Sequence, residues 1–284
     1  MGERRASHTA TLLQNGTVLV TGGVGRSSSR LAELYDPSDD TWSSTGSMND
    51  ARVGHGAVLL DDGRVLVAGS GPSVEIYDPD TGTWAYTVSP SLSIRTPELK
   101  LLEDGRVLHS GTPSSVFDLP SLTWTDTPMV TGHIAHAATR LGDGTVLAAG
   151  GRVGAVSASR EAELFDPATS EWTETERMGS PRLLHGIVRL PNGDALAVGG
   201  QGVASLGCDD NYSLASSEEY DLIHRTWRTL RPLNTGRADH TVTNVLRRGE
   251  SEEIVLAAGG FVVKAICEGE VFWGVTNTAE IYVQ

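Results

Sequence analysis

Short apolar runs that end in glycine recur along the whole chain at regular intervals. Each run is apolar at successive positions, which is typical of a β-strand covered on both faces. The six runs with their glycines are 18–23, 65–70, 107–111, 146–151, 195–200 and 254–260. A period of roughly 45 residues indicates a repeat architecture rather than two unrelated domains.

Each repeat contains four short segments that read as strands. The first opens with a histidine, as in 8–13, and the second is the run that ends in glycine. The third ends in an aromatic-Asp-Pro sequence, as in 33–37, and the fourth carries a tryptophan. Asn-Gly or Asp-Gly pairs stand between the first two segments, and such pairs supply the positive φ angles of a two-residue hairpin. The pairs are 15–16, 62–63, 104–105, 143–144 and 192–193. The pattern predicts four antiparallel strands in each repeat.

The glycine doublet, the later aromatic residue and the spaced tryptophan together resemble the Kelch repeat, over essentially the whole chain. The resemblance implies an all-β, six-bladed Kelch β-propeller with four antiparallel strands per blade. We expect a single domain, 1–284, with blades at approximately 5–45, 52–88, 94–127, 133–176, 182–230 and 237–284.

The sixth repeat is expected to lack its outermost strand. Met1 precedes His8 by the same seven residues that separate Met48 from His55, and the last residues, 280–284, fall in a third strand. One interpretation is a chain that begins late, so that the lack of a signal peptide says nothing about location. The other is an open blade with an exposed edge, which proteins usually avoid. We favour the first.

Charge and composition exclude several classes of protein. The 22 Lys and Arg against 36 Asp and Glu give 22 − 36 = −14, which argues against nucleic acid and against an anionic membrane surface as partners. A hydrophobic fraction of 39% with 20% charged residues excludes a disordered chain. No apolar run is long enough to cross a bilayer.

Three polar residue types recur once per repeat. Arginine stands at Arg5, Arg52, Arg95, Arg182 and Arg237, with His133 in the fourth repeat. Histidine stands at His8, His55, His136, His185 and His240, with Pro97 in the third, and glutamate at Glu33, Glu75, Glu163, Glu219 and Glu280. The resemblance places the arginines near the mouth of a central channel, where they would suit an anion. The alternative, which we favour, is that these residues tie the blades together. Histidines spaced one per blade do not match a zinc site.

The third repeat departs from the others. It has Glu98 and Lys100 in its first strand and Ser115 in place of the repeated glutamate. These two charged residues either present polar groups toward a ligand or compensate each other. The sequence leaves both possibilities open.

The segments after the glycine doublet are long only in the fifth and sixth repeats, at 201–217 and 261–277. Long loops on a rigid scaffold are where binding residues gather. The candidate binding residues there are Asp209, Asp210, Tyr212, Phe272 and Trp273. Asp209 and Asp210 do not match an EF-hand spacing. Trp273 has a second interpretation, slightly favoured, in which it pins its own loop to the scaffold.

The only two cysteines, Cys208 and Cys267, stand at matching places in these two segments. A disulfide between them would close 267 − 208 = 59 residues and stabilise by roughly 4 kcal/mol. It would imply an oxidising compartment, so we expect a secreted or periplasmic protein. Two free thiols in a cytoplasmic protein are the alternative.

The function favoured by the sequence is a non-catalytic binding module. It would recognise a protein or a small anionic ligand through the two long segments and the arginines, as a monomer with no cofactor. The alternative is an enzyme similar to the periplasmic sialic-acid mutarotase, with Arg182, Arg237, His133 and Glu98 acting on an anionic sugar. Copper-radical oxidases resembling galactose oxidase are a poorer match, because only Tyr212 beside a cysteine fits their ligands.

Overall fold

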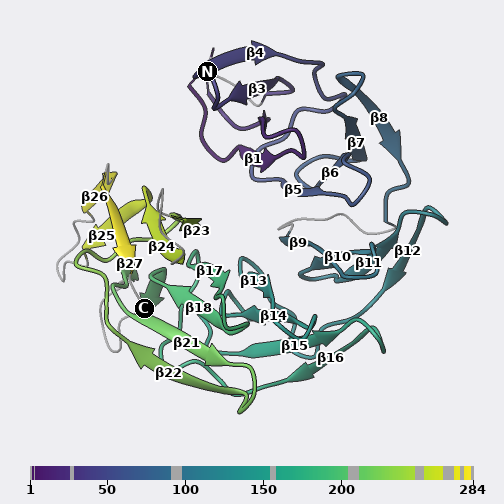
Figure 1. Ribbon diagram of the computed structural model, residues 1–284. Helices are drawn as coiled ribbons and strands as arrows, with labels where there is room; N and C mark the ends of the chain where they lie inside the picture. The colour runs from purple at the N-terminus through teal and green to yellow at the C-terminus, as the bar shows by residue number, and fades with distance from the viewer. Residues whose placement is uncertain are drawn as a thin grey trace. The chain divides into compact units, whose positions relative to one another are not determined.

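The computed structural model describes the chain except for residues 1, 3, 26–28, 91–97, 154–157, 204–210, 247–252, 265–271, 276–277 and 283–284. The described residues form 27 strands and no helix (Figure 1). They group into six blade sheets and two additional two-stranded hairpins. Five of the sheets have four strands and the sixth has three, as the sequence predicts. The fold is therefore all-β and six-bladed.

The chain divides into two compact units, Met1–Pro128 and Met129–Gln284, each with three blades. A single domain over 1–284 stays a prediction. In the first unit, blade one contains β1(Thr9–Leu12), β2(Val18–Thr21), β3(Ala32–Asp36) and β4(Thr41–Ser44). Blade two contains β5(Gly56–Leu59), β6(Val65–Ala68), β7(Val74–Asp78) and β8(Thr83–Thr87). Blade three contains β9(Glu98–Leu101), β10(Val107–Ser110), β11(Ser115–Asp118) and β12(Thr123–Asp126).

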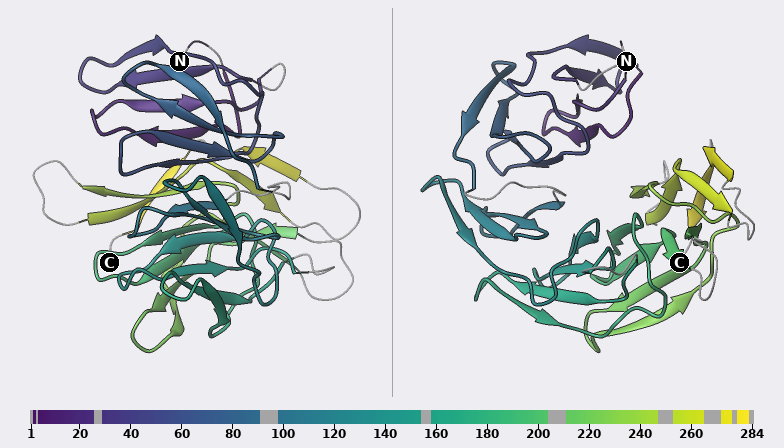
Figure 2. Two further views of the ribbon diagram at one scale, coloured as in Figure 1. Left: turned by 90° about the vertical axis from the view of Figure 1, so that its right-hand side faces the viewer. Right: turned by 180° about the vertical axis from the view of Figure 1, so that it is seen from behind.

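The second unit holds the remaining blades and both hairpins (Figure 2). Blade four contains β13(Ala137–Arg140), β14(Val146–Ala149), β15(Ala162–Asp166) and β16(Glu171–Glu174). Blade five contains β17(Gly186–Arg189), β18(Ala195–Val198), β21(Ser217–Asp221) and β22(Thr226–Leu230). Blade six contains β23(Thr241–Leu246), β24(Glu253–Ala258) and β27(Ala279–Tyr282). The hairpins are β19(Gln201–Val203) with β20(Asn211–Ser213), and β25(Phe261–Lys264) with β26(Phe272–Val275).

The apolar cores lie between consecutive blades of each unit, because the second strand of a blade is buried on both faces. In blade two, Val65 and Val67 pack with Leu19 of blade one and with Met48 of the connection between the two blades. Leu66, on the other face of the same strand, packs with Val107 of blade three. Similar clusters join blades four and five, and blades five and six. Each blade is thus stabilised mainly by its neighbours, as repeat proteins are.

The repeated aromatic residues and tryptophans complete these interfaces. The ring of Tyr77 lies 5.0 Å from that of Trp84 within blade two. Trp84 Nε1 donates a 2.7 Å hydrogen bond to the Gly46 carbonyl, which belongs to the segment leaving blade one. Trp124 and Trp227 make the same bond to the carbonyls of Val88 and Glu176. The tryptophan signal in the sequence therefore marks contacts between blades.

The first glycine of three doublets, at Gly22, Gly150 and Gly199, is required by close packing. Gly150 has a φ of +69°, and a Cβ there would lie 2.5 Å from the Arg182 carbonyl oxygen and 2.8 Å from His185 Cε1. Both atoms belong to the next blade. A side chain at this position would therefore push blades four and five apart.

Candidate functional site

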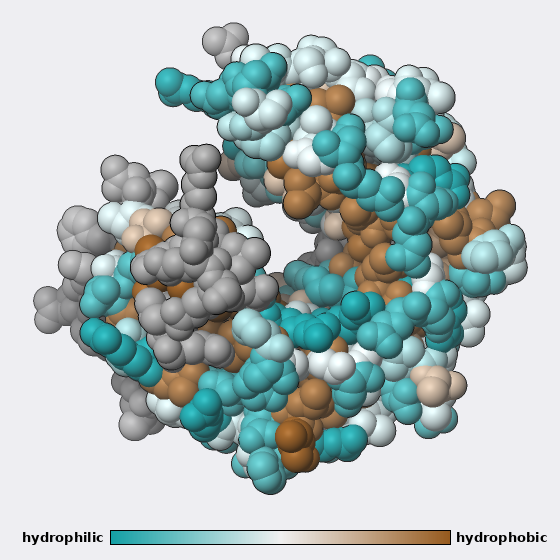
Figure 3. All heavy atoms as spheres, in the orientation of Figure 1, coloured by the Kyte–Doolittle hydropathy of each residue, from teal (hydrophilic) through white to brown (hydrophobic). Residues whose placement is uncertain are grey.

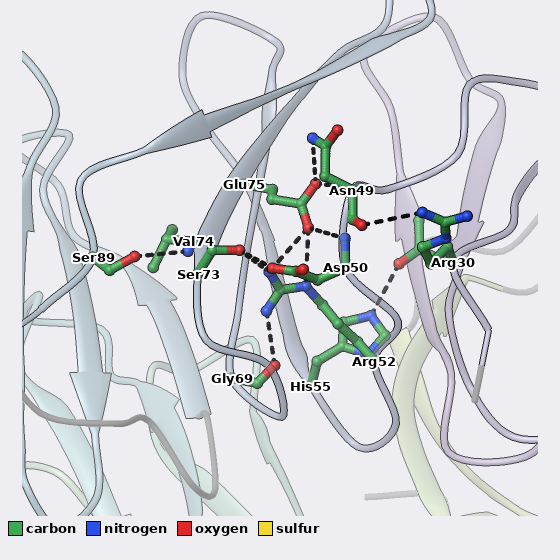
Figure 4. A network of polar contacts seen from close by, with 11 residues as sticks. Arg30, Asn49, Asp50, Arg52, His55, Gly69, Ser73, Val74, Glu75 and Ser89 are labelled. Atoms are coloured by element: carbon green, nitrogen blue, oxygen red, sulfur yellow. Dashed lines mark hydrogen bonds and ion pairs between the residues drawn. The ribbon is translucent and has the colours of Figure 1, made fainter.

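The repeated arginines, which are candidates for anion binding, form buried ion pairs within the blades. In blade two, Arg52 Nη2 lies 3.0 Å from Glu75 Oε1, and both side chains are 0% exposed (Figure 4). Arg52 Nη1 also donates to the Gly69 carbonyl at 2.9 Å. The Glu75 carboxylate accepts backbone N–H bonds from Asn49 and Asp50. The network fastens the segment entering blade two to the third strand of that blade, and leaves Arg52 closed to a dissolved anion.

Three other blades repeat this ion pair. Arg5 lies 2.6 Å from Glu33, Arg237 lies 2.7 Å from Glu280, and Arg182 pairs with Glu218. The arginine side chains of all three pairs are 0–2% exposed. These contacts support the alternative in which the repeated residues tie each blade together. They do not support an anion funnel built from these arginines.

The comparison of the repeats assigned Glu219 as the repeated glutamate of the fifth repeat, but the structure assigns this role to Glu218. Glu218 pairs with Arg182, whereas Glu219 pairs with Arg228 at 2.7 Å. The sheet register explains the error, because Glu218 lies opposite Ala197, as Glu75 lies opposite Val67 in blade two. Two adjacent glutamates gave the sequence no basis for choosing between them without that register.

His133 replaces the arginine in blade four and keeps the same contacts. Its Nδ1 lies 2.7 Å from the Gly150 carbonyl oxygen and its Nε2 lies 3.0 Å from Glu163 Oε1. Burial raises the pKa of Glu163, but hydrogen bonds from His133, Thr131 and backbone N–H groups outweigh this and lower the pKa to about 2. His133 is therefore part of the blade, and not an exposed ligand for an anion.

The repeated histidines lie between blades. His55 Nε2 is 3.0 Å from the hydroxyl oxygens of Thr9 and Thr21 in blade one. Among the residues that the structure describes, the ring nitrogens of His185 and His240 have no hydrogen-bond partner. The residues at the two threonine positions are Ala137 and Ala149 in blade four, and Gly186 and Val198 in blade five, so no hydroxyl is available.

Burial keeps these rings neutral. Desolvation lowers the pKa of His55 and of His240 to about 4, and lowers the pKa of His185 well below its ordinary value. The neighbouring arginine of each repeat adds to the effect. These are the properties of packing residues rather than of proton-transferring groups at neutral pH.

In blade three, Glu98 and Lys100 pair with each other at 2.9 Å. The contact corresponds to the alternative in which the two charges compensate. Arg95 and Pro97 lie outside the described residues. Sequence reasoning missed His109, which stands in the second strand of this blade and is 1% exposed. Neither ring nitrogen of His109 has a hydrogen-bond partner in the described part of the chain, and burial lowers its pKa to about 4. The sequence did carry a signal for His109, because this histidine interrupts the apolar run of the second strand.

The two long segments of blades five and six are not simple loops, because each contains two short strands that pair as a β-hairpin. Gln201 pairs with Ser213 in the first hairpin, and Phe261 pairs with Val275 in the second. Strands β20 and β25 lie side by side, and Ser213 Oγ donates a 3.3 Å hydrogen bond to the Phe261 carbonyl. Neither blade four nor any blade of the first unit has such a hairpin in the described part of the chain.

Of the candidate residues in these hairpins, the structure describes the side chain of Tyr212, which is 37% exposed. Phe272 and Trp273 lie in β26, but their side chains are outside the description. Asp209, Asp210, Cys208 and Cys267 also lie outside the described residues. The disulfide therefore stays a prediction.

Within the described ranges, no three or more His, Cys, Asp or Glu side chains are grouped as metal ligands. No helix long and apolar enough to cross a membrane occurs in the described part of the chain.

Comparisons with known proteins agree with this architecture. The family model of the Kelch motif matches residues 5–49. No curated protein sequence matches the chain. Among solved structures, the chain is similar to a fungal alcohol oxidase of the AA5 family in complex with copper, with a TM-score of 0.73 and 18% identity. The likeness covers 92% of this chain and 59% of the oxidase chain, and at this identity it concerns the fold alone. Because the motif matched at 5–49 recurs through sheets of the same strand order, the chain belongs to the Kelch-repeat β-propeller proteins.

Proposed function

We propose that this protein is a non-catalytic binding module that recognises a protein partner through the hairpins of blades five and six. The observation that carries the proposal is the pair of adjacent hairpins, β19–β20 and β25–β26, added to an otherwise regular set of blades. Both leave the end of a blade at which its second strand finishes. Insertions on a rigid scaffold are where binding residues usually gather.

The contacts of the repeated polar residues favour binding over catalysis. The alternative enzyme needs a carboxylate and a histidine free to move protons, together with an arginine free to hold a substrate anion. Arg182 and Arg237 are instead paired with glutamates, and His133 is bound to Glu163. Glu98 is paired with Lys100.

Photo-cross-linking from Tyr212 tests the proposal. Tyr212 is replaced by p-benzoylphenylalanine, and the control carries the same group at Tyr86, which is 59% exposed in outer strand β8 of the first unit. We expect a defined partner to be captured from position 212 and not from position 86. A trimmed variant with Asn-Gly in place of 203–211 keeps the Gln201–Ser213 pairing and should bind the purified partner at least tenfold more weakly. Unchanged affinity of the trimmed variant would contradict the proposal.

We also propose that Cys208 and Cys267 form a disulfide and that the protein works in an oxidising compartment, secreted or periplasmic. The support is topological, since the segments that carry the cysteines connect the strands of two hairpins that lie side by side. Peptide mapping of the unreduced protein should find the two cysteine peptides joined. Free thiols at both positions in protein purified without reductant would refute it.

A further inference from the structure

The turns at one end of blades one and two enclose a cleft of about 470 Å³ in the first unit. Residues 13–15, after β1, form one side of it, and residues 62–64, between β5 and β6, form another. Residues 78–80, where β7 ends, complete the lining. Figure 3 shows hydrophilic residues gathered beside β7 and hydrophobic ones beside β5. The lining itself is mostly polar, with two amides, three carboxylates and one guanidinium.

The side chain of Gln14 keeps this cleft open. Its Nε2 donates a 3.1 Å hydrogen bond to the Asp61 carbonyl in the turn of blade two, and its Oε1 would lie 3.1 Å from a Cβ added at Gly63. The equivalent residue in blade four is Gly142, which is likewise the second residue after the first strand. Gly142 N donates directly to the Gly193 carbonyl at 2.9 Å, so the turns of blades four and five are in contact. A side chain in place of a bare glycine therefore separates the turns of blades one and two.

Blade two lacks a side-chain donor that three other blades provide beside the cleft's counterpart. There the aspartate that ends the third strand accepts a hydrogen bond from a nearby side chain: Asp36 from Ser38, Asp118 from Ser121 and Asp221 from His224. Blade two has Asp80 at the position of Ser38, and so adds a second carboxylate beside Asp78. Asp78 Oδ1 accepts backbone bonds from Asp80 and Thr81. Asp78 Oδ2 and both Asp80 oxygens receive no hydrogen bond from any residue that the structure describes.

The cleft carries more negative than positive charge. Among the described residues that line it, Arg64 is the one cation, and its Nε and Nη2 donate to Asp62 Oδ2 at 2.9 and 2.6 Å. Three carboxylates and one guanidinium give 1 − 3 = −2. Asp62 is thus compensated within its own turn. The carboxylates of Asp78 and Asp80 lie two residues apart and repel each other, so a cation between them would be stabilising.

We propose that this cleft binds a small organic cation, an alkyl ammonium or guanidinium group, through Asp78 and Asp80. Both groups carry only hydrogen-bond donors, and their charge-assisted bonds to carboxylates are strong. Gln14 Oε1 offers a further acceptor, and Pro79 gives the alkyl chain an apolar surface. An organic cation fits better than a metal ion, because no three acidic side chains of the described residues are grouped as metal ligands. The cleft belongs to the first unit and the hairpins to the second, so this proposal does not rest on protein binding by the hairpins.

Two-dimensional amide NMR of the isotope-labelled full chain at low ionic strength tests the cleft with three probes: agmatine, N-acetylarginine amide and neutral butanol. We expect at least one of the two cations to shift the backbone amide of Gly63 and the side-chain amide of Gln14 saturably, and butanol to shift neither. Tighter binding of agmatine indicates a free small cation as the ligand. Tighter binding of N-acetylarginine amide indicates a basic side chain of a peptide.

Asp80→Ser removes one carboxylate and restores the donor that Ser38 supplies in blade one, so it should fold and weaken cation binding roughly fivefold. Gln14→Gly copies Gly142 of blade four and should also weaken binding, because the turns can then close on each other. The matched control is Asp126→Asn, which removes an exposed carboxylate of β12 in the same unit outside the cleft and should leave the affinity unchanged. The proposal is overturned if neither cation gives a saturable shift, if butanol binds as tightly as the cations, or if Asp80→Ser and Asp126→Asn bind equally well.

Discussion

His109 should make the protein sensitive to acid, and replacing it should remove a measurable part of that sensitivity. The ring lies in the second strand of blade three with both nitrogens buried and unpaired. Burial lowers its pKa from 6.5 to about 4. The unfolded chain therefore binds more protons than the folded protein between pH 4 and 6.5, and the free energy of unfolding falls as the pH falls through this window.

The size of the effect follows from the pKa difference. One pKa unit corresponds to about 1.4 kcal/mol, so His109 should cost about 2 kcal/mol of stability at pH 5 and only a few tenths at pH 7. His109→Val is the suitable change, because valine occupies the same register position at Val20 and Val67 in blades one and two. Any cavity left by the smaller side chain affects both pH values equally and cancels in the comparison.

Urea unfolding followed by tryptophan fluorescence at pH 7 and pH 5 measures the difference. Between these pH values, the wild-type protein should lose about 2 kcal/mol more than His109→Val. His224→Gln is the control: its hydrogen bond and ion pair with Asp221 raise the pKa of this exposed histidine, so its removal should not reduce acid sensitivity. Equal losses in wild type and His109→Val would refute the reasoning.

Three further tests address the buried ion pair of blade two, a turn in blade three and the packing between blades four and five. Arg52→Met alone, or Glu75→Gln alone, should lower the free energy of unfolding, measured in urea, by about 3–5 kcal/mol, because each leaves one buried charge unpaired. The double variant leaves no buried charge unpaired, so its loss should be smaller than the sum of the two single losses. Leu122→Gly should stabilise the protein by up to about 1 kcal/mol and so raise its melting temperature slightly. Leu122 has a φ of +53°, which strains a leucine, and Gly82 occupies the equivalent turn position in blade two. Gly150→Ala should instead lower the melting temperature, since the new Cβ would meet a backbone carbonyl at 2.5 Å; a stable Gly150→Ala protein would contradict the packing described.

The sequence predicted the strands well because their signals are local. Hairpin glycines, apolar runs and tryptophans each act within a few residues, and their repetition averages out individual exceptions. The prediction of three strands for blade six came from comparing the spacing of Met1 and His8 with that of Met48 and His55, and the structure confirms it. Errors arose where the outcome depends on register or on inserted sequence. Glu218 and Glu219 were confused because only sheet pairing distinguishes them. The hairpin β19–β20 was read as a loop because Gln201–Val203 is too short to give a pattern.

The candidate site was harder to predict, because repetition makes structural residues conspicuous and hides functional ones. Arg52 recurs in nearly every blade, yet its guanidinium is fully bonded inside the fold. Arg189 occurs at an ordinary strand position, and only a comparison of sheet registers shows that Leu59 and Leu101, which pack between blades, are its equivalents. A charge that the fold itself satisfies has no free hydrogen-bond donor for a ligand, whereas a half-buried charge without a protein partner is open to solvent or to a ligand. In a repeat protein, a charged residue that departs from the repeat, such as Arg189, is therefore a better place to test for ligand binding than the paired arginine at Arg52.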